Sequence, residues 1–203
     1  MFWDAVSGIY SLFEKAYNGK VNRAAGKAVA AEICSTDDVL ECACGTGLLT
    51  TAIAPCCKSL IATDFSVGML RQTERRVSRC GNVKLIRANI MRLQCRKNRF
   101  DKVVAGNVIH LLDDPQAALR ELSRVCKPDG KLIIPTYIND NGSGKTGFLI
   151  RVISKSGADF KQQFTLERYR QFFRDAGFPD AEITLISGRV PCAVAVLRNH
   201  KTA

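Results

Sequence analysis

The sequence predicts a single α/β domain built around a mostly parallel β-sheet with helices on both faces. Two observations lead to this prediction. Short apolar runs rich in β-branched residues alternate with amphipathic helical patterns through the middle of the chain, and such alternation is typical of a parallel sheet covered on both faces. In addition, 203 residues with 46% hydrophobic content are enough to bury one core.

Helical patterns come first, and strands follow. The apolar residues of WDAVSGIYSLFEKAY recur at helical spacing, and a second pattern, VNRAAGKAVAAEI, follows the break at 18–20, so we expect residues 1–35 to be helical. Helical patterns also occupy 66–79 and 114–126. The predicted strands between and around them cover 38–43, 59–65, 82–88, 101–107 and 131–137.

The alternation breaks after Tyr137. The loop that follows is rich in Asn, Gly and Ser, and we expect residues 138–160 to form an insert. Thr165 is the expected N-cap of the next helix, and Gly177 its stop. Two further strand runs, 181–187 and 192–198, complete the pattern, which contains no internal repeat.

Nine cysteines are scattered through the chain at positions 34, 42, 44, 56, 57, 80, 95, 126 and 192. Their odd number, the lack of a C-x-x-C pair and the presence of only two histidines predict reduced thiols and no metal site. We expect Cys42 and Cys44 to point to the same face of a strand. Cys56 and Cys57 are expected to be ordinary buried or half-buried thiols, with soft-metal chemistry as the alternative.

The formal net charge of +11 is concentrated between Arg71 and Lys102, where eleven basic residues accompany Glu74 and Asp101. Such a cluster suits RNA, an anionic membrane surface or an acidic substrate. A solvated face is the alternative, favoured by the lack of interleaved aromatic residues. No apolar stretch approaches the roughly 18 to 20 residues that span a bilayer, and the N-terminus does not resemble a secretion signal, so we expect a soluble cytoplasmic protein.

The stretch VLECACGTGLLT, Val39 to Thr50, predicts a strand, a loop and the start of a helix. In open α/β sheets this carboxyl end of a strand is where ligands bind. Gly45 and Gly47 allow backbone to approach a ligand closely. The spacing lacks the final glycine of the dinucleotide pattern G-x-G-x-x-G, so the loop alone is weak support for a nucleotide ligand.

Two later strand ends add polar residues to this edge. Asp64 ends the second strand, where a carboxylate can accept both hydroxyl hydrogens of a ribose; the alternative is a helix N-cap, a role that Ser66 fills equally well. Asn89 follows the third strand, and its amide can read an adenine edge while Ile90 packs on the ring. Taken alone, Asn89 is equally expected as a turn residue.

Five segments together resemble the class I S-adenosylmethionine-dependent methyltransferases, in the methyltransferase type 11 branch that includes quinone-biosynthesis enzymes. They are VLECACGTG, IATDFSVGML, NVKLIRANIMRL, the segment from Phe100 to Ile138 and the closing pair of strands, and they span roughly 38–198. The resemblance implies a Rossmann-like sheet of seven mostly parallel strands with an antiparallel C-terminal hairpin. It also implies S-adenosyl-L-methionine as cofactor and S-adenosyl-L-homocysteine as product.

Carried over by position, the resemblance assigns cofactor contacts along the chain. Glu41 matches the acidic residue of the first motif, at the methionine end of the cofactor, and Ala43 replaces the first glycine of the loop. The loop residues against that end are Ala43, Cys44, Gly45, Thr46 and Gly47. The other positions are Asp64 on the ribose, Phe65 and Met69 beside the adenosine, Asn89 and Ile90 on the adenine, Asn107 facing the cofactor and His110 near the methyl group.

The function that follows is methyl transfer to a small-molecule acceptor by in-line displacement, in which the protein mainly supplies alignment. His110 is a candidate general base, and its alternative role is that of a histidine satisfied at an apolar helix start. We expect residues 1–35 to form a lid over the cofactor, although the same aromatic spacing is typical of core. Residues 138–160 are the expected wall of the acceptor pocket.

Other functions stay open at this point. An RNA methyltransferase would use the basic 71–102 face, although NVIH stands at 107–110 where methyltransferases of base amines carry Asn-Pro-Pro-Tyr. A non-catalytic protein would bind S-adenosylmethionine without turnover. The vicinal pair Cys56–Cys57 also raises arsenite or thiol methylation. The acceptor, its attacked atom and the oligomeric state are left open.

Overall fold

A computed structural model describes residues 18–139 and 164–200; the expected first helix and most of the 138–160 insert lie outside these residues. The strands are β1 (Asp38–Cys42), β2 (Ser59–Asp64), β3 (Val83–Arg87), β4 (Phe100–Ala105), β5 (Cys126–Tyr137), β6 (Glu182–Ile186) and β7 (Cys192–Arg198). The helices are a segment at 18–31, α2 (Leu48–Ile53), α3 (Val67–Val77), α4 (Pro115–Val125) and α6 (Leu166–Asp175), with short 3-10 helices at Ala54–Cys56 and Ile109–Leu111.

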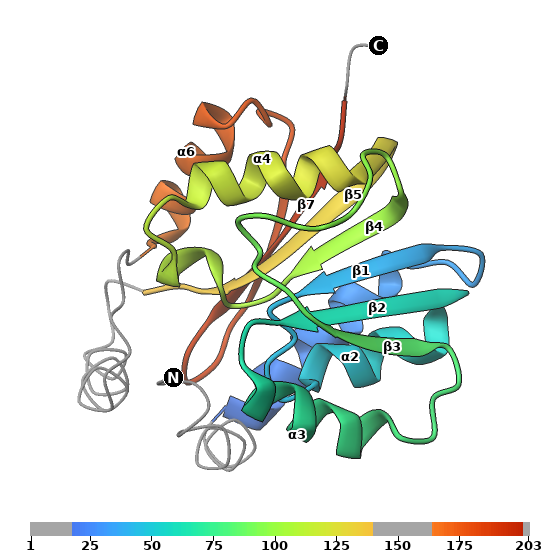
Figure 1. Cartoon of the computed structure of the whole chain (residues 1–203). Helices are drawn as coiled ribbons and strands as arrows, with labels where there is room; N and C mark the ends of the chain where they lie inside the picture. Colours follow the sequence, from blue (N-terminus) through green and yellow to red (C-terminus); the bar gives the residue numbers. More distant parts are fainter. Residues whose placement is uncertain (1–17, 140–163, 201–203) are drawn as a thin grey trace.

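The seven strands form one sheet in the order β3-β2-β1-β4-β5-β7-β6 (Figure 1). The first five strands pair in parallel, whereas β7 runs antiparallel to both β5 and β6. This confirms the predicted α/β fold with its antiparallel C-terminal hairpin. Because β1 lies between β2 and β4, the strand order reverses beside β1, and open α/β sheets bind ligands at such a point.

Each face of the sheet has its own apolar layer. Helix 18–31, α2 and α3 lie on one face, and α4 and α6 lie on the other (Figure 1). On the α4 side, Leu40 packs in a cluster with Leu119. On the opposite side, Val39 packs in a cluster with Val29 and Ile53. Since consecutive residues of β1 enter different layers, this strand is buried on both faces, as its continuous apolar run predicts.

Strand β5 begins earlier than the predicted start at 131. Helix α4 ends at Val125, and Cys126 already pairs with Phe100 of β4. Pro128 has no N–H with which to continue a helix, so the chain takes an extended path. The pairing with β4 is irregular there, with a register shift between Phe100 and Lys102.

The prediction that Cys42 and Cys44 share one face of a strand is wrong. β1 ends at Cys42, and Ala43 has a φ of 53°. This left-handed residue breaks the alternation of an extended strand. Cys42 therefore packs in the layer under α4, and Cys44 packs in the opposite layer with α2.

Helix termini follow the predicted capping residues. Thr165 accepts a hydrogen bond from the N–H of Arg168, and Gly177 follows α6 with a φ of 86°. Ser66 caps α3 by accepting a hydrogen bond from the N–H of Met69 at 3.1 Å. The alternative assignment of Asp64 as this cap is therefore wrong.

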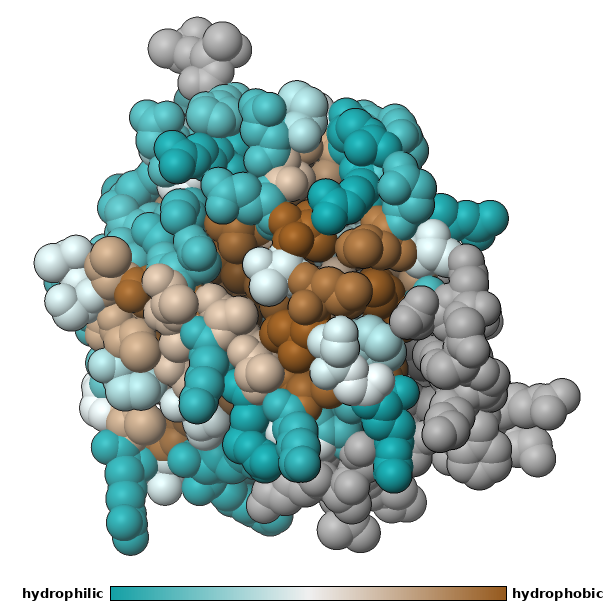
Figure 2. All heavy atoms as spheres, turned by 180° about the vertical axis from the view of Figure 1, so that it is seen from behind, coloured by the Kyte–Doolittle hydropathy of each residue, from teal (hydrophilic) through white to brown (hydrophobic). Residues whose placement is uncertain are grey.

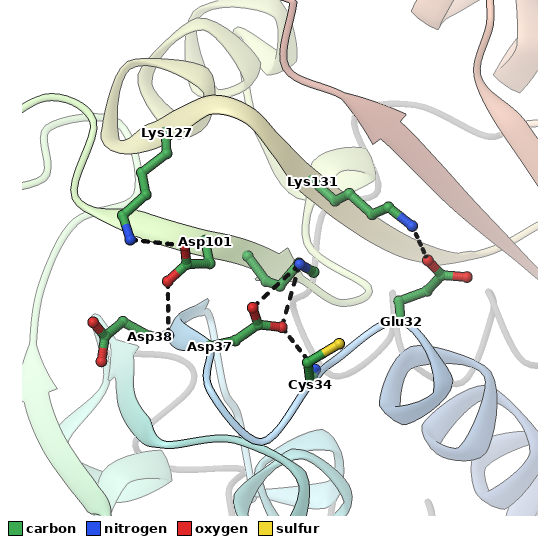
Figure 3. Close-up of polar contacts among 8 residues, drawn as sticks. Glu32, Cys34, Asp37, Asp38, Asp101, Lys127 and Lys131 are labelled. Atoms are coloured by element: carbon green, nitrogen blue, oxygen red, sulfur yellow. Dashed lines mark hydrogen bonds and ion pairs between the residues drawn. The ribbon is translucent and has the colours of Figure 1, made fainter.

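Charged side chains pair at the amino ends of the central strands (Figure 3). This amino-end cluster comprises Glu32, Asp37, Asp101, Lys102, Lys127 and Lys131. Asp37 Oδ2 lies 3.2 Å from Lys102 Nζ, and Asp101 Oδ1 accepts a hydrogen bond from Lys127 Nζ at 2.7 Å. Burial raises the pKa of Asp101, but the bonds from Lys127 and from the N–H of Asp38 outweigh it, and the pKa is lowered. Lys102 therefore belongs to this cluster instead of an exposed basic face.

Candidate functional site

A pocket of about 340 Å³ opens at the carboxyl ends of the parallel strands. Ten predicted site residues line it: Glu41, Ala43, Cys44, Gly45, Asp64, Phe65, Met69, Asn89, Ile90 and Asn107. Three others, Thr46, Gly47 and His110, are not among its lining residues. The ends of β1, β2, β4 and β5 all contribute to this carboxyl-end pocket, as the rule for open α/β sheets predicts.

The loop after β1 is built from alternate left-handed residues. Ala43, Gly45 and Gly47 have φ values of 53°, 56° and 84°. A Cβ on Gly47 would lie 2.9 Å from the Cγ2 atom of Thr73 in α3. Gly47 thus allows α2 to start close to α3, whereas Gly45 lines the pocket. Ala43 takes a conformation that costs an alanine about 1 to 2 kcal/mol.

Asp64 links this loop to the end of β2. Its Oδ2 atom accepts a hydrogen bond from the N–H of Gly45 at 2.9 Å, and Oδ1 accepts one from the N–H of Ser66 at 2.8 Å. Thr73 also fixes the loop, because its hydroxyl donates to the carbonyl oxygen of Gly45 at 2.8 Å. The carboxylate is therefore held at the pocket wall by backbone groups on both sides.

Glu41 presents a buried carboxyl group to the pocket. The residue is 1% exposed, and Oε2 has no hydrogen-bond partner within 18–139 and 164–200. Burial raises the pKa of Glu41 to about 8; the side chain of Thr50 lowers it in part, and the charge of Asp64 raises it. The carboxyl is thus mainly neutral at pH 7, and a cation entering the pocket would favour its ionised form.

One end of the pocket is partly apolar and lies next to Asp64. Met69 and Ile90 are buried there, whereas Phe65 is 50% exposed. The guanidinium carbon of Arg87 lies 5.3 Å from the centre of the Phe65 ring. Asn89 Oδ1 accepts a hydrogen bond from the N–H of Met91 at 2.9 Å, so Asn89 supports a turn and also lines the pocket.

The other end of the pocket carries a polar bridge between three elements. The hydroxyl of Tyr137, at the end of β5, donates to Asn22 Oδ1 in helix 18–31 at 2.6 Å. The N–H of Tyr137 donates to Asn107 Oδ1 at 3.0 Å. Three apolar side chains, Val108, Leu111 and Leu112, line the adjacent wall.

Gly106 brings the segment after β4 against α2. A Cβ at this position would lie 2.4 Å from the Cδ1 atom of Leu49. A larger residue here would have to displace the side chain of the buried Leu49. The contact fixes the strand end that is followed by Asn107.

His110 lies behind the pocket wall. It sits in the 3-10 helix Ile109–Leu111 and is 5% exposed, while its neighbours Val108 and Leu111 line the pocket. Burial lowers the pKa of His110 to about 4. The imidazole is therefore neutral at pH 7 and is a weak proton acceptor.

Several lining residues were not identified from the sequence. They are Asn22, Ala25, Leu48, Leu49, Ala88, Gly106, Val108, Leu111, Leu112, Pro135 and Tyr137. The rule that ligands meet strand ends gives a signal for Tyr137 and Pro135, which end the fifth predicted strand. Asn22 carries no local signal, because its contact with Tyr137 joins residues 115 positions apart.

Within 18–139 and 164–200, no group of three His, Cys, Asp or Glu side chains is placed to hold a metal ion. None of the helices described is long and apolar enough to cross a membrane.

Known proteins similar to this chain are methyltransferases. Residues 40–134 match a family model described as a methyltransferase domain. A demethylmenaquinone methyltransferase of a Geobacillus species is 30% identical over 167 residues, which cover 71% of each chain. The namesake of Corynebacterium urealyticum is 40% identical over 101 residues, which cover 50% of this chain and 42% of that relative.

The fold also matches solved structures. A methyltransferase from Thermotoga maritima described as SAM-dependent superposes with a TM-score of 0.71 at 20% identity, covering 98% of this chain and 100% of that one. At this identity the likeness concerns the fold. It agrees with the Rossmann-like sheet seen in Figure 1.

Proposed function

The chain belongs to the family of S-adenosylmethionine-dependent methyltransferases, and on that premise we propose that it methylates the ring of a quinol-type small molecule. The observation that carries the proposal is a pocket with two different ends. Carboxyl groups of Glu41 and Asp64 lie at one part of it, and an apolar wall of Val108, Leu111 and Leu112 lies at another. The relatives named for demethylmenaquinone support a flat, apolar acceptor.

The pocket residues fit S-adenosylmethionine. The unsatisfied Oε2 of Glu41 suits the ammonium group of the methionine end. Asp64, fixed by two backbone N–H groups, suits the ribose hydroxyls, and the buried Met69 and Ile90 suit the adenine. When bound, the cofactor supplies a sulfonium methyl group. Thr46 and Gly47 do not line the pocket, and in this proposal they contribute to cofactor binding by shaping the loop after β1.

The chemistry favours a reduced acceptor. A quinone ring is an electrophile, whereas the ring oxygens of a hydroquinol push electron density onto the ring carbon, so we assign the nucleophile to the hydroquinol form. The carbon electron pair forms the new C–CH₃ bond, sulfur keeps the pair of the broken S–CH₃ bond, and the ring hydrogen leaves as a proton to solvent. The protein holds the reactants in line.

This reaction needs no strong base, and we assign none to His110. A histidine with a pKa near 4, set behind the wall, is a poor acceptor for the departing proton. We assign His110 to packing of the 3-10 helix that carries Leu111. The predicted role of His110 near the methyl group is thereby replaced by a structural one in this proposal.

We also propose that residues 1–35 and 138–160 complete the pocket of a single domain. Helix 18–31 already supplies Asn22 and Ala25 to the lining. The insert begins at Ile138, directly after the pocket residue Tyr137. Both segments therefore adjoin the acceptor end of the pocket in the chain.

A cytoplasmic location is supported by the thiols. All nine cysteines are free in the structure, and four of them, Cys42, Cys44, Cys57 and Cys192, have pKa values raised by burial. Unpaired cysteines in this number are typical of a reducing compartment.

The first test is calorimetric titration with S-adenosylmethionine and S-adenosylhomocysteine. We expect saturable binding, and we expect Asp64→Ala to weaken it at least about tenfold because the ribose acceptor is lost and the Gly45 N–H loses its partner. Asp180→Ala, at an exposed turn, is the control. Absence of binding at millimolar ligand by the folded wild type would remove the assignment.

The second test is methyl transfer to 1,4-naphthohydroquinone under reducing conditions, followed by the mass gain of one methylene unit. We expect product in which the methyl group is on the ring carbon. If the protein binds the cofactor and yields no ring-methylated product, the quinol acceptor is overturned while the family membership stands.

A further inference from the structure

The carboxamide of Asn107 is fixed in orientation by the backbone around it. Its own N–H donates to the carbonyl oxygen of Pro135 at 2.7 Å, and its Oδ1 accepts the N–H of Tyr137 at 3.0 Å. The residue has a φ of 53°, a conformation that asparagine tolerates better than most residues. Both strand β5 and the end of β4 therefore determine where this side chain lies.

This orientation leaves the donor half of the amide available. Because the N–H of Tyr137 must face an oxygen, the assignment of Oδ1 and Nδ2 follows from the hydrogen-bond pattern. No residue within 18–139 or 164–200 accepts a hydrogen bond from Asn107 Nδ2. Asn107 lines the pocket beside Val108 and is half-buried, so a ligand there meets two N–H donors with no competing partner from the described chain.

The neutral carboxyl of Glu41 can also donate a hydrogen bond, but the proposed function assigns that group to the ammonium end of the cofactor. Two other polar groups of the pocket do not offer a donor. The Tyr137 hydroxyl is committed to Asn22 Oδ1 at 2.6 Å. Both carboxyl oxygens of Asp64 already accept backbone hydrogen bonds, from the N–H groups of Gly45 and Ser66. The wall next to Asn107 is apolar, through Leu111 and Leu112, and so excludes water that would otherwise solvate a ligand oxygen.

We propose that Asn107 Nδ2 donates a hydrogen bond to a ring oxygen of the acceptor and so selects phenol- and hydroquinol-type rings over rings without that oxygen. The position of the acceptor rests on the proposed function. A donor aimed at this oxygen stabilises its ionised form, and an ionised ring oxygen raises the electron density of the neighbouring carbon. Asn107 is then a specificity-determining residue for the acceptor, and in this proposal that role replaces the cofactor contact that the family resemblance assigns to it.

The test measures binding of 1-naphthol and naphthalene in the presence of saturating S-adenosylhomocysteine. Asn107→Asp keeps an acceptor for the Tyr137 N–H and removes the donor; Asn107→Gly removes the side chain and accepts the positive φ. Asn98 also has a positive φ, of 55°, and lies outside the pocket lining, so Asn98→Asp and Asn98→Gly are matched controls.

We expect both Asn107 variants to bind 1-naphthol about tenfold more weakly, and Asn107→Gly to bind naphthalene as the wild type does. The absorbance of bound 1-naphthol should show its ionisation shifted to lower pH by the wild type and by the Asn98 variants, but not by Asn107→Gly. Unchanged 1-naphthol affinity and ionisation in both Asn107 variants would overturn the proposal. Because this assay involves no methyl transfer, its outcome tests the Asn107 donor whether or not hydroquinol is the true acceptor.

Turnover gives a second readout. We expect Asn107→Asp and Asn107→Gly to retain the cofactor affinity of the wild type within about twofold, while kcat/KM for 1,4-naphthohydroquinone falls about 10- to 100-fold. A loss of cofactor affinity equal to the loss of kcat/KM would instead identify Asn107 as a cofactor contact and overturn the acceptor role.

Discussion

Acidic side chains have opposite environments at the two ends of the central strands. At the amino ends, Asp37 and Asp101 each meet a lysine ammonium and a backbone N–H (Figure 3). Near the carboxyl end of β1, Glu41 is buried, and its Oε2 has no hydrogen-bond partner among the described residues. Paired charges at one end stabilise the fold, whereas an unsatisfied carboxyl at the other end costs stability and is available to a ligand.

The largest effect should come from breaking a pair at the amino end. Asp37→Asn leaves the ammonium of Lys102, with a side chain 14% exposed, without its counter-ion. We expect the free energy of unfolding to fall by about 4 kcal/mol, measured by urea titration. S-adenosylmethionine affinity should not change while the protein is folded.

The adjacent Asp38 offers the matched control for that change. Its ion pair with Lys58 spans 4.0 Å, and the two side chains, 37% and 66% exposed, are more accessible to solvent than those of the Asp37–Lys102 pair. Asp38→Asn should therefore cost no more than about 1 kcal/mol. Equal losses in the two variants would show that the burial of the Asp37 pair has no energetic importance.

At the carboxyl end, Glu41 should make stability depend on pH. Its pKa is raised from 4.5 to about 8, so between these values the folded protein holds a proton that the unfolded chain has released. The contribution of Glu41 to the free energy of unfolding is fully present below pH 4.5 and is lost as pH rises through about 8. We expect Glu41→Gln to remove a decline of about 1 kcal/mol per pH unit between pH 5 and 8 from the urea-derived stability.

The same variant should weaken cofactor binding. Glutamine matches the shape of the neutral acid but cannot become the counter-ion of an ammonium group, so we expect S-adenosylmethionine affinity to fall about tenfold, or by about 1.4 kcal/mol. Glu182→Gln, at an exposed position of β6, is the control. A stability profile that is identical in Glu41→Gln and the wild type would mean that Glu41 is charged in the free protein.

The smallest expected effect concerns backbone strain. Positive φ values near the amino ends fall on Asn98 and Asp129, which tolerate them, whereas Ala43 carries one at the carboxyl end. Ala43→Gly should raise the free energy of unfolding by about 0.5 to 1 kcal/mol, after allowing for the more flexible unfolded chain. Ala62→Gly, in the buried strand β2, should instead destabilise the protein by about 1 kcal/mol. If Ala43→Gly were less stable than the wild type, the positive φ of Ala43 would not be a source of strain.

The sequence predicted most of the fold because the relevant signals are local. Apolar runs located all seven strands, and capping residues such as Thr165 located helix ends. The start of β5 was missed because irregular pairing with Phe100, a contact across the sheet, extends that strand. The shared face of Cys42 and Cys44 was predicted for an extended chain, and the left-handed Ala43 ended the strand between them.

For the site, strand-end reasoning and the family resemblance together named ten residues that line one pocket. The hydrogen bonding and the burial of the site residues could not be predicted from the sequence. That Glu41 is unsatisfied and His110 lies behind the wall depends on packing between distant segments. The bridge from Asn22 to Tyr137 likewise requires the three-dimensional arrangement, since neither residue carries a motif.

The position of β7 in the sheet sets an order for assembly of the chain on the ribosome. β6 is synthesised before β7, yet β7 lies between β6 and β5. Until residues 192–198 have emerged, β6 has no native neighbour, and the outer edge of β5 stays unpaired. Tyr137 pairs in register with Cys192, so the polar bridge at the pocket gains its last supporting strand only at this late stage. A nascent chain halted before residue 192 would display the β5 edge to chaperones.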